Sequence, residues 1–128
     1  MPETPVFFFW DDEGSAPVFE ALQAMLRQGK RKELAKCLVR IARLAEKGHE
    51  LRRPEADLLR DGIHELRATH RRQHYRILYF FHGAEAILSH LVVKERAIPQ
   101  REIERAIMNR EKFTADPGKH TFHGMGWR

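Results

Sequence analysis

The chain has 128 residues, of which 42% are hydrophobic and 32% are charged. This composition predicts one domain with a single core and argues against a second domain. The formal net charge of +5 at pH 7 favours a polyanionic partner without identifying it. A single cysteine forms no internal disulfide bond, and no apolar run approaches the ~20 residues of a membrane-spanning helix. We therefore expect a cytoplasmic protein with no membrane contact.

The first half of the chain predicts one strand and two helices. The aromatic run Pro5–Asp11 favours a short strand. Apolar residues at helical spacing predict a first helix that ends at Gly29, and a second helix from Lys30 to Lys47. We interpret His49–Arg60 as a polar connection.

The second predicted helix carries a row of basic residues on its polar face, which we call the basic stripe. Its members are spaced three or four residues apart, and they are Lys36, Arg40, Arg43 and Lys47. A solvated helix face commonly has this pattern, so an ordinary surface is one interpretation. The other is contact with RNA phosphates or with an acidic segment of a partner.

The second half predicts three strands and one helix. Two strands joined by a basic turn lie within Gly62–Phe81, and a third covers Ala86–Lys94. A last helix begins at Pro99. We expect little regular structure in the tail, residues 116–128, and a single domain over residues 1–115.

The order strand, two helices, three strands, helix predicts an α+β fold. We expect a small, twisted, mostly antiparallel sheet with helices packed on one face and a basic cleft on the other. Alternation in the third strand places one set of side chains on one face, namely Leu88, His90, Val92 and Lys94. The other face would carry Ile87, Ser89, Leu91 and Val93.

Arg76 is the anomalous residue of the central strand. Alternation places it on the same face as Leu78 and Phe80, and a buried arginine is costly unless it meets an anion or a wet cleft. The same rule puts Glu65 and Arg67 together on the preceding strand. If the two strands form a hairpin, the three charged side chains converge. An ordinary structural ion pair with Glu65 is the alternative interpretation.

Three segments in this order carry a family resemblance: GIHELR, YRILYFF and HLVVKERAIPQREIERA. Over roughly Asp11–Phe113 the chain resembles the RelE superfamily of bacterial toxins, most closely its HigB-type, phage-derived branch. The resemblance implies a RelE-like fold and the toxin of a type II toxin–antitoxin system. Such a toxin is a ribosome-dependent endoribonuclease that cuts mRNA without a metal or other cofactor. Its implied partner is a small antitoxin of the HigA kind, with a helix-turn-helix domain.

RNA cleavage by a ribose 2′-hydroxyl needs a base, cations for the phosphate oxygens and an acid for the leaving oxygen. Glu65 is our candidate base. Arg67 and Arg76 suit the phosphate, because guanidinium forks match phosphate oxygens. Lys94, at the end of the third strand, would add a phosphate contact or donate a proton. These four residues form the predicted catalytic set.

Several other residues are predicted to support this chemistry. His64 and His90 are alternative bases, although His64 and Glu65 point to opposite faces of a flat strand. Further RNA contacts are expected from Arg71 and Arg72 in the hairpin turn, from Arg96, and from the basic stripe.

Two other functional classes compete with a nuclease. The run HELRATH superficially resembles a zinc-protease signature, but His64 and His70 have the wrong spacing for helical zinc ligands, so we predict no metal site. A non-catalytic basic RNA- or ribosome-binding module explains the charges equally well, with Arg67, Arg76 and Lys94 only gripping phosphates. Only a cleavage experiment separates that module from a nuclease.

Overall fold

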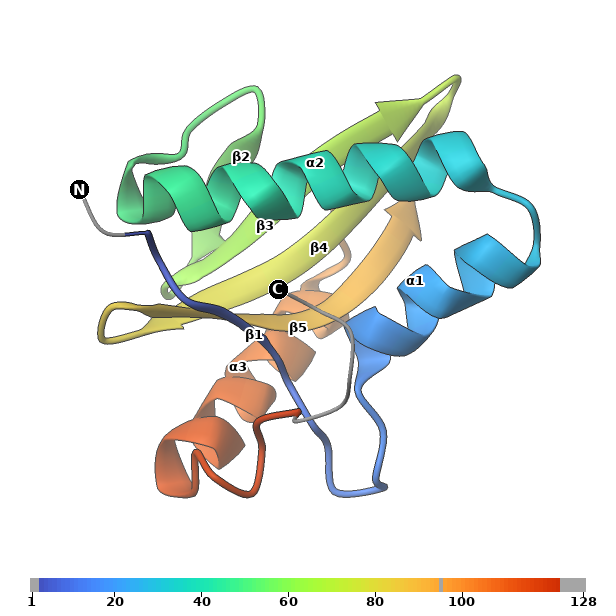
Figure 1. The fold of residues 1–128 in the computed structure, drawn as a ribbon. Helices are drawn as coiled ribbons and strands as arrows, with labels where there is room; N and C mark the ends of the chain where they lie inside the picture. Colours follow the sequence, from blue (N-terminus) through green and yellow to red (C-terminus); the bar gives the residue numbers. More distant parts are fainter. Residues whose placement is uncertain (1–2, 95, 123–128) are drawn as a thin grey trace.

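The computed structural model describes residues 3–122 except residue 95. Figure 1 shows a curved sheet with helices on both faces. The elements in chain order are β1 (Val6–Phe8), α1 (Pro17–Arg27), α2 (Arg31–Lys47), the short 3-10 helix η1 (Gly48–Glu50), β2 (Ala56–Arg60), β3 (Ile63–His70), β4 (Gln73–His82), β5 (Glu85–Lys94) and α3 (Gln100–Ala115).

The five-stranded sheet has the order β1-β5-β4-β3-β2. β1 pairs in parallel with β5, and the remaining neighbours are antiparallel. The predicted α+β class is therefore confirmed, with a mostly antiparallel sheet, two N-terminal helices and one C-terminal helix.

α1 and α2 cover one face of the sheet, as Figure 1 shows. Cys37, Ile41 and Leu44 recur at helical spacing on α2 and are buried. They belong to the same core cluster as Leu66 and Ile77 from β3 and β4. The apolar stripe of α2 thus fixes which face of the central strands it covers.

α3 covers the opposite face of the sheet. Its buried Ile103, Ala106 and Phe113 pack in a second cluster with Leu78 and Phe80 of β4. The expectation that all helices share one face is therefore wrong for α3. The physical reason is that β4 is apolar on both faces, so both faces need a cover.

β2 is a strand that we expected to be part of a polar connection. Ala56 is buried and lies opposite Leu66 of β3, whereas Leu58 is 57% exposed. β2 is an edge strand with little alternation in burial, which explains why its sequence pattern is weak. Its pairing with β3 brings Asp57 directly opposite Glu65.

The hairpin of β3 and β4 turns at Arg71 and Arg72, which are the two residues between the strands. Arg71 adopts a positive φ of 58°, as the primed turns of short hairpins require. This turn fixes the register, and Arg67 faces Arg76 across the ladder. The predicted hairpin and the predicted faces of its two strands are confirmed.

A bulge interrupts the alternation of β5. Leu78 lies opposite His90 and Tyr79 lies opposite Leu88, so Ser89 is the extra residue. Leu88 consequently joins the α1 and α2 side, while His90 points toward α3. The prediction that Leu88 and His90 share a face is wrong, because one inserted residue reverses the parity of the strand.

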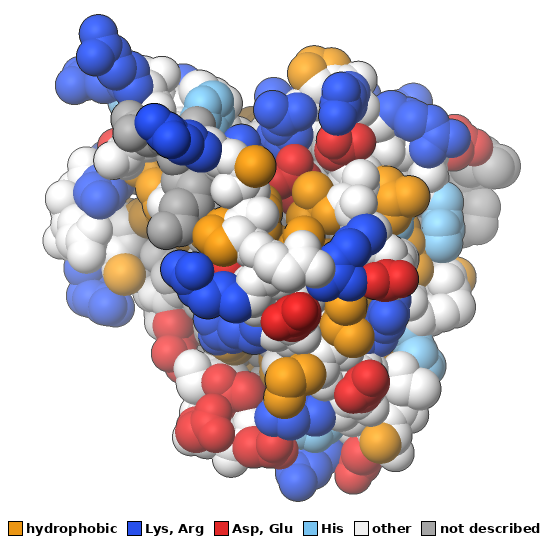
Figure 2. Space-filling view, turned by 180° about the vertical axis from the view of Figure 1, so that it is seen from behind, with side chains coloured by type: hydrophobic (Ala, Val, Ile, Leu, Met, Phe, Trp, Pro, Cys, Tyr) orange, Lys and Arg blue, Asp and Glu red, His pale blue; other side chains and the backbone are white. Residues whose placement is uncertain are grey.

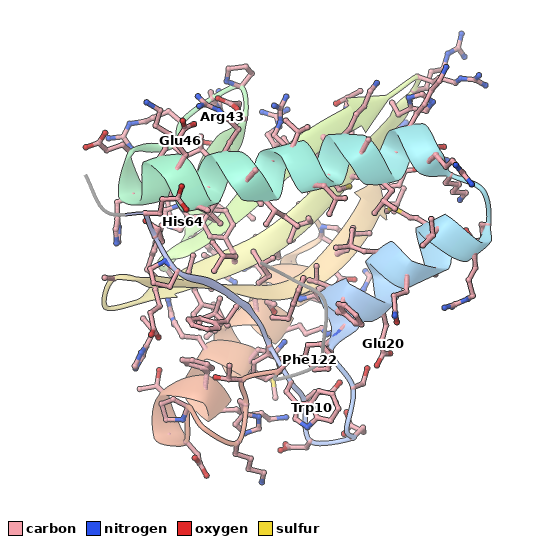
Figure 3. The ribbon with its side chains drawn as sticks, viewed as in Figure 1. Trp10, Glu20, Arg43, Glu46, His64 and Phe122 are labelled. Atoms are coloured by element: carbon pink, nitrogen blue, oxygen red, sulfur yellow. The ribbon has the colours of Figure 1, made fainter. Side chains whose placement is uncertain are left out.

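The chain returns to the β1 edge after α3. Residues 117–120 form turns, and Thr121 makes an isolated bridge with Phe9. Phe122 stacks on Trp10 with ring centroids 5.3 Å apart (Figure 3). Phe122 also contacts Phe19. This part of the predicted tail has little regular structure but packs against the domain; residues 123–128 lie outside the described range.

Candidate functional site

A cleft of about 550 Å³ lies on the α3 face of the sheet. β2, β3 and β4 provide its floor, and the segment that leads from β5 into α3 provides one wall. The charged residues that line it are mostly basic: Arg53, Asp57, Arg60, Glu65, Arg67, Arg76 and Arg96. Figure 2 shows this face, where Lys and Arg side chains are interspersed with acidic ones.

The strand register brings Glu65, Arg67 and Arg76 together in this cleft. Arg76 Nε lies 3.7 Å from Glu65 Oε1, and Arg67 Nε lies 3.8 Å from Glu65 Oε2. The side chains of Glu65 and Arg76 are only 4% and 10% exposed, whereas that of Arg67 is 34% exposed. The predicted convergence is present, with Glu65 between two guanidinium groups.

The contact between Glu65 and Arg76 is an ion pair without a hydrogen bond. Within the described part of the chain, Glu65 Oε1 and Arg76 Nε are buried and have no hydrogen-bond partner. Leaving a buried polar group unsatisfied costs about 1–3 kcal/mol. Such a cost is common at functional sites.

Burial raises the pKa of Glu65 above its ordinary value. Arg76 and Arg67 act against this effect by favouring the carboxylate, while Asp57 adds to it. The carboxylate, once formed, therefore binds a proton more strongly than an exposed glutamate does. A raised pKa moves a carboxylate toward the basicity that proton abstraction needs near neutral pH.

Asp57 is a member of the site that sequence reasoning missed. It lies opposite Glu65, and Arg53 Nη2 donates a hydrogen bond of 2.7 Å to its Oδ2. This hydrogen bond lowers the pKa of Asp57, against the opposing effect of burial. Asp57 would have been predicted if β2 had been recognised as a strand, because pairing of β2 with β3 places Asp57 opposite Glu65.

The description that matches this chain in a scan of protein families is "Phage derived protein Gp49-like (DUF891)", over residues 24–111. That segment is more than half of the 128 residues, and it contains Glu65, Arg67 and Arg76. The chain belongs to the Gp49-like family. This family belongs to the RelE/toxin-like superfamily, so the superfamily resemblance is confirmed. A comparison with curated proteins finds no match.

In this Gp49-like protein the basic stripe, which lies on α2, is outside the cleft lining. Lys36 Nζ donates to the Thr69 carbonyl at 3.0 Å, and Arg40 Nε donates to the Arg67 carbonyl at 2.8 Å. Both carbonyls belong to the part of β3 that extends beyond β2. These cations therefore cover an open sheet edge, which is a structural role.

The C-terminal half of the stripe is tied to the segment before β2. Arg43 Nε donates to Glu55 Oε2 at 2.9 Å, and Arg43 also pairs with Glu46, as Figure 3 shows. The hydrogen bond from Arg43 lowers the pKa of Glu55. Lys47 is exposed at the end of α2. RNA contact by the stripe stays a prediction.

The other predicted RNA contacts occupy different places in the Gp49-like fold. Arg71 and Arg72 are exposed at the tip of the hairpin, outside the cleft lining. Arg96 is exposed and lines the cleft. The backbone of Lys94 ends β5 opposite His74, but its side chain lies outside what the structure describes.

The two alternative bases, His64 and His90, are absent from the cleft lining. His64 stacks on Tyr79 on the other face of the sheet, below the end of α2 (Figure 3). His90 is 1% exposed, and burial lowers its pKa to about 4. Its Nε2 lies 3.1 Å from Glu102 Oε1. Of the three candidates, Glu65 alone lies in the cleft.

The part of the chain that the structure describes contains no group of three or more His, Cys, Asp or Glu placed to hold a metal ion. Nor does that part include a helix with the length and apolarity needed to cross a bilayer.

Proposed function

We propose that this Gp49-like protein is the toxin of a type II toxin–antitoxin pair, a HigB-type endoribonuclease that cuts mRNA on the ribosome and inhibits translation. The observation that carries the proposal is the buried Glu65 between Arg76 and Arg67, where the ion pair of Glu65 Oε1 with Arg76 Nε forms without a hydrogen bond. Membership of a superfamily whose members are commonly toxin-like supports it.

Glu65 acts as the general base in this proposal. Its carboxylate takes the proton of a ribose 2′-hydroxyl, and the 2′-oxygen attacks the adjacent phosphorus. The new bond closes a 2′,3′-cyclic phosphate, and the bond from phosphorus to the 5′-oxygen breaks. The pKa of Glu65, raised by burial, makes its carboxylate a stronger base than an exposed one.

Arg76 and Arg67 bind the phosphate oxygens and stabilise the charge that develops during attack. A guanidinium next to a buried carboxylate is already fixed in place, so little reorganisation is needed at the moment of reaction. The leaving 5′-oxygen takes a proton from an acid, a role that we assign to Lys94. These side chains perform the whole reaction without a metal ion.

The cleft supplies charges, while the ribosome is proposed to hold the RNA. Alignment of the attacking oxygen with the leaving group carries a large part of the barrier in such reactions. A site built mainly of cations therefore needs a partner that orients the strand, and mRNA in the ribosomal A site is held in this way. The protein partner of the free toxin would be a helix-turn-helix antitoxin in the cytoplasm.

Inducible expression in a bacterial host tests this function. We expect wild type to arrest growth and to create new internal mRNA ends, and Arg76→Ala to lose both at equal protein level. Removal of a fixed charge-stabilising group typically slows chemistry about 10²–10³-fold. Arg52→Ala is the matched control, because Arg52 is exposed and lies outside the cleft lining.

A harmless wild type that is soluble and well expressed would contradict the proposal. The non-catalytic RNA- or ribosome-binding module would then be the better account. Equal cleavage by Arg76→Ala and wild type would contradict the assigned site. The protein would then be a nuclease whose active site lies elsewhere in the chain.

A further inference from the structure

Two carboxylates face each other across the β2–β3 ladder inside the cleft. Asp57 lies directly opposite Glu65, and both belong to the floor of the cleft. Side chains in this relation have Cβ atoms about 4.5–5.5 Å apart, and like charges there destabilise the sheet. Each carboxylate is paired with a guanidinium: Glu65 with Arg76 and Asp57 with Arg53.

The two guanidinium groups differ in depth. Arg76 is 10% exposed, whereas Arg53 is 72% exposed and lies at the mouth of the cleft. An exposed ion pair four residues apart contributes little to stability, so stability alone does not account for a second acid opposite Glu65. The effect of the pair is positional, because Asp57 holds Arg53 over the cleft.

Arg53 retains the capacity to bind an anion while it is held. A guanidinium carries five N–H donors, and the bond from Nη2 to Asp57 engages one arm of the fork. The Arg53–Asp57 contact lowers the pKa of Asp57, so the anchor stays ionised at neutral pH. Deeper in the cleft, the buried Nε of Arg76 lies 3.7 Å from Glu65 Oε1 without a hydrogen bond, and this guanidinium marks a first anion position.

We propose that Arg53, anchored by Asp57, forms an outer phosphate site. The cleft then binds two successive phosphates of one RNA strand, the scissile phosphate at Arg76 and Arg67 and its neighbour at Arg53. The inference rests on the proposed function in taking RNA as the ligand. Its consequence for the substrate class is that the cleft binds an oligonucleotide strand, since a single phosphodiester leaves the outer site empty.

Salt dependence of RNA binding tests the outer site without requiring cleavage. The probe is a fluorescein-labelled RNA hexamer with 2′-O-methyl groups, which has no free 2′-hydroxyl for attack, and binding is followed by anisotropy over a series of KCl concentrations. The slope of log K against log salt is negative, and each phosphate contact adds about 0.7 to its magnitude for a single strand. We expect Arg53→Ala to reduce this magnitude by about 0.7 and Arg53→Lys to keep most of it.

Arg52→Ala is the matched control, because it removes an equal charge from the neighbouring residue outside the cleft lining. It should keep the wild-type slope. An equal loss of slope in Arg52→Ala and Arg53→Ala would overturn the outer site, since general surface charge would then account for binding. Failure of wild type to bind the probe would overturn it as well.

Asp57→Asn distinguishes the positioning of Arg53 by Asp57 from the effect of net charge on RNA binding. If only net charge mattered, removing this carboxylate would tighten RNA binding. If Asp57 holds Arg53 in place, we expect the variant to bind no more tightly than wild type. Tighter binding by Asp57→Asn would overturn the anchoring role. Circular dichroism of each variant establishes that the fold is retained.

The outcomes also separate this inference from the proposed function. A reduced slope in Arg53→Ala together with no mRNA cleavage by wild type would support the outer site and contradict the nuclease. Cleavage by wild type together with an unchanged slope in Arg53→Ala would overturn the outer site alone.

Discussion

At the scale of single residues, the burial of Glu65 makes the stability of the fold depend on pH. Burial raises its pKa, so the fold binds its proton more tightly than the unfolded chain does. Below the ordinary pKa of 4.5 the carboxyl is protonated in both states, and its contribution to stability is fully present. As pH rises through the folded pKa this contribution is lost, because the ion is less favourable inside than in water.

Replacing Glu65 with Gln should remove this pH dependence. We expect the free energy of unfolding of Glu65→Gln, minus that of wild type, to increase as pH rises above 4.5 toward neutrality. Urea unfolding followed by circular dichroism at several pH values measures it. Glu111→Gln, at an exposed position of α3, is the control. A difference that decreases with pH would show that the arginines outweigh burial.

At the scale of elements, a buried polar network joins the bulge of β5 to α3. Asn109 Nδ2 donates to Ser89 Oγ at 2.8 Å, and Ser89 Oγ lies 2.9 Å from His90 Nδ1. A neutral His90 completes this series of hydrogen bonds, because its Nδ1 accepts from Ser89 and its Nε2 donates to Glu102. A neutral imidazole fits the pKa of His90, which is lowered to about 4. The bulge that broke the predicted alternation therefore attaches the helix beside the cleft.

The pH dependence of this network has the opposite sign to that of Glu65. Because folding lowers the pKa of His90, stability is present above its ordinary value of 6.5 and is lost as pH falls toward 4. We expect His90→Gln to lose less stability than wild type over this window, although it starts about 1–3 kcal/mol less stable. His74→Gln, on β4, is the comparison in the same urea experiments. Parallel curves for His90→Gln and wild type would contradict the assignment.

At the scale of the whole molecule, different parts of the structure lie at the two edges of the sheet. The cleft lies toward the β2 edge, whereas the chain after α3 packs at the β1 edge. Phe122 contacts Phe8, Phe19 and Trp10 there. This separation predicts that stability and the proposed RNA cleavage respond independently to changes at the β1 edge.

Phe122→Ala tests that separation. Truncating this partly buried ring should lower the free energy of unfolding by about 1–3 kcal/mol, less than for a fully buried phenylalanine. We expect mRNA cleavage at a temperature well below unfolding to match wild type. Thermal unfolding and end mapping measure the two effects. Loss of cleavage in a folded variant would place this edge in the site.

Strong periodicity made part of this architecture predictable. α2 and the hairpin follow patterns of 3.6 and 2 residues, and the convergence of Glu65, Arg67 and Arg76 follows from the second pattern. β2 lacks such a pattern because it is a half-exposed edge strand, so the pairing of Asp57 with Glu65 was missed.

Other features depend on long-range packing that a local pattern does not carry. The bulge at Ser89 leaves the sequence of β5 looking regular, although it reverses the faces beyond it. The position of α3 depends on the second apolar face of β4, which needs a cover of its own.

The chemistry of the RNA ends tests the central claim most directly. Purified protein is added to ribosomes programmed with mRNA, and the products and single-turnover rates are compared for wild type and Glu65→Gln. We expect a cut in the A-site codon with 2′,3′-cyclic phosphate and 5′-hydroxyl ends, blocked by a 2′-O-methyl group at the attacking ribose. Loss of the base should slow the cut by about 10²–10⁴-fold. Products with 5′-phosphate ends, or an unchanged rate in Glu65→Gln, would contradict the account.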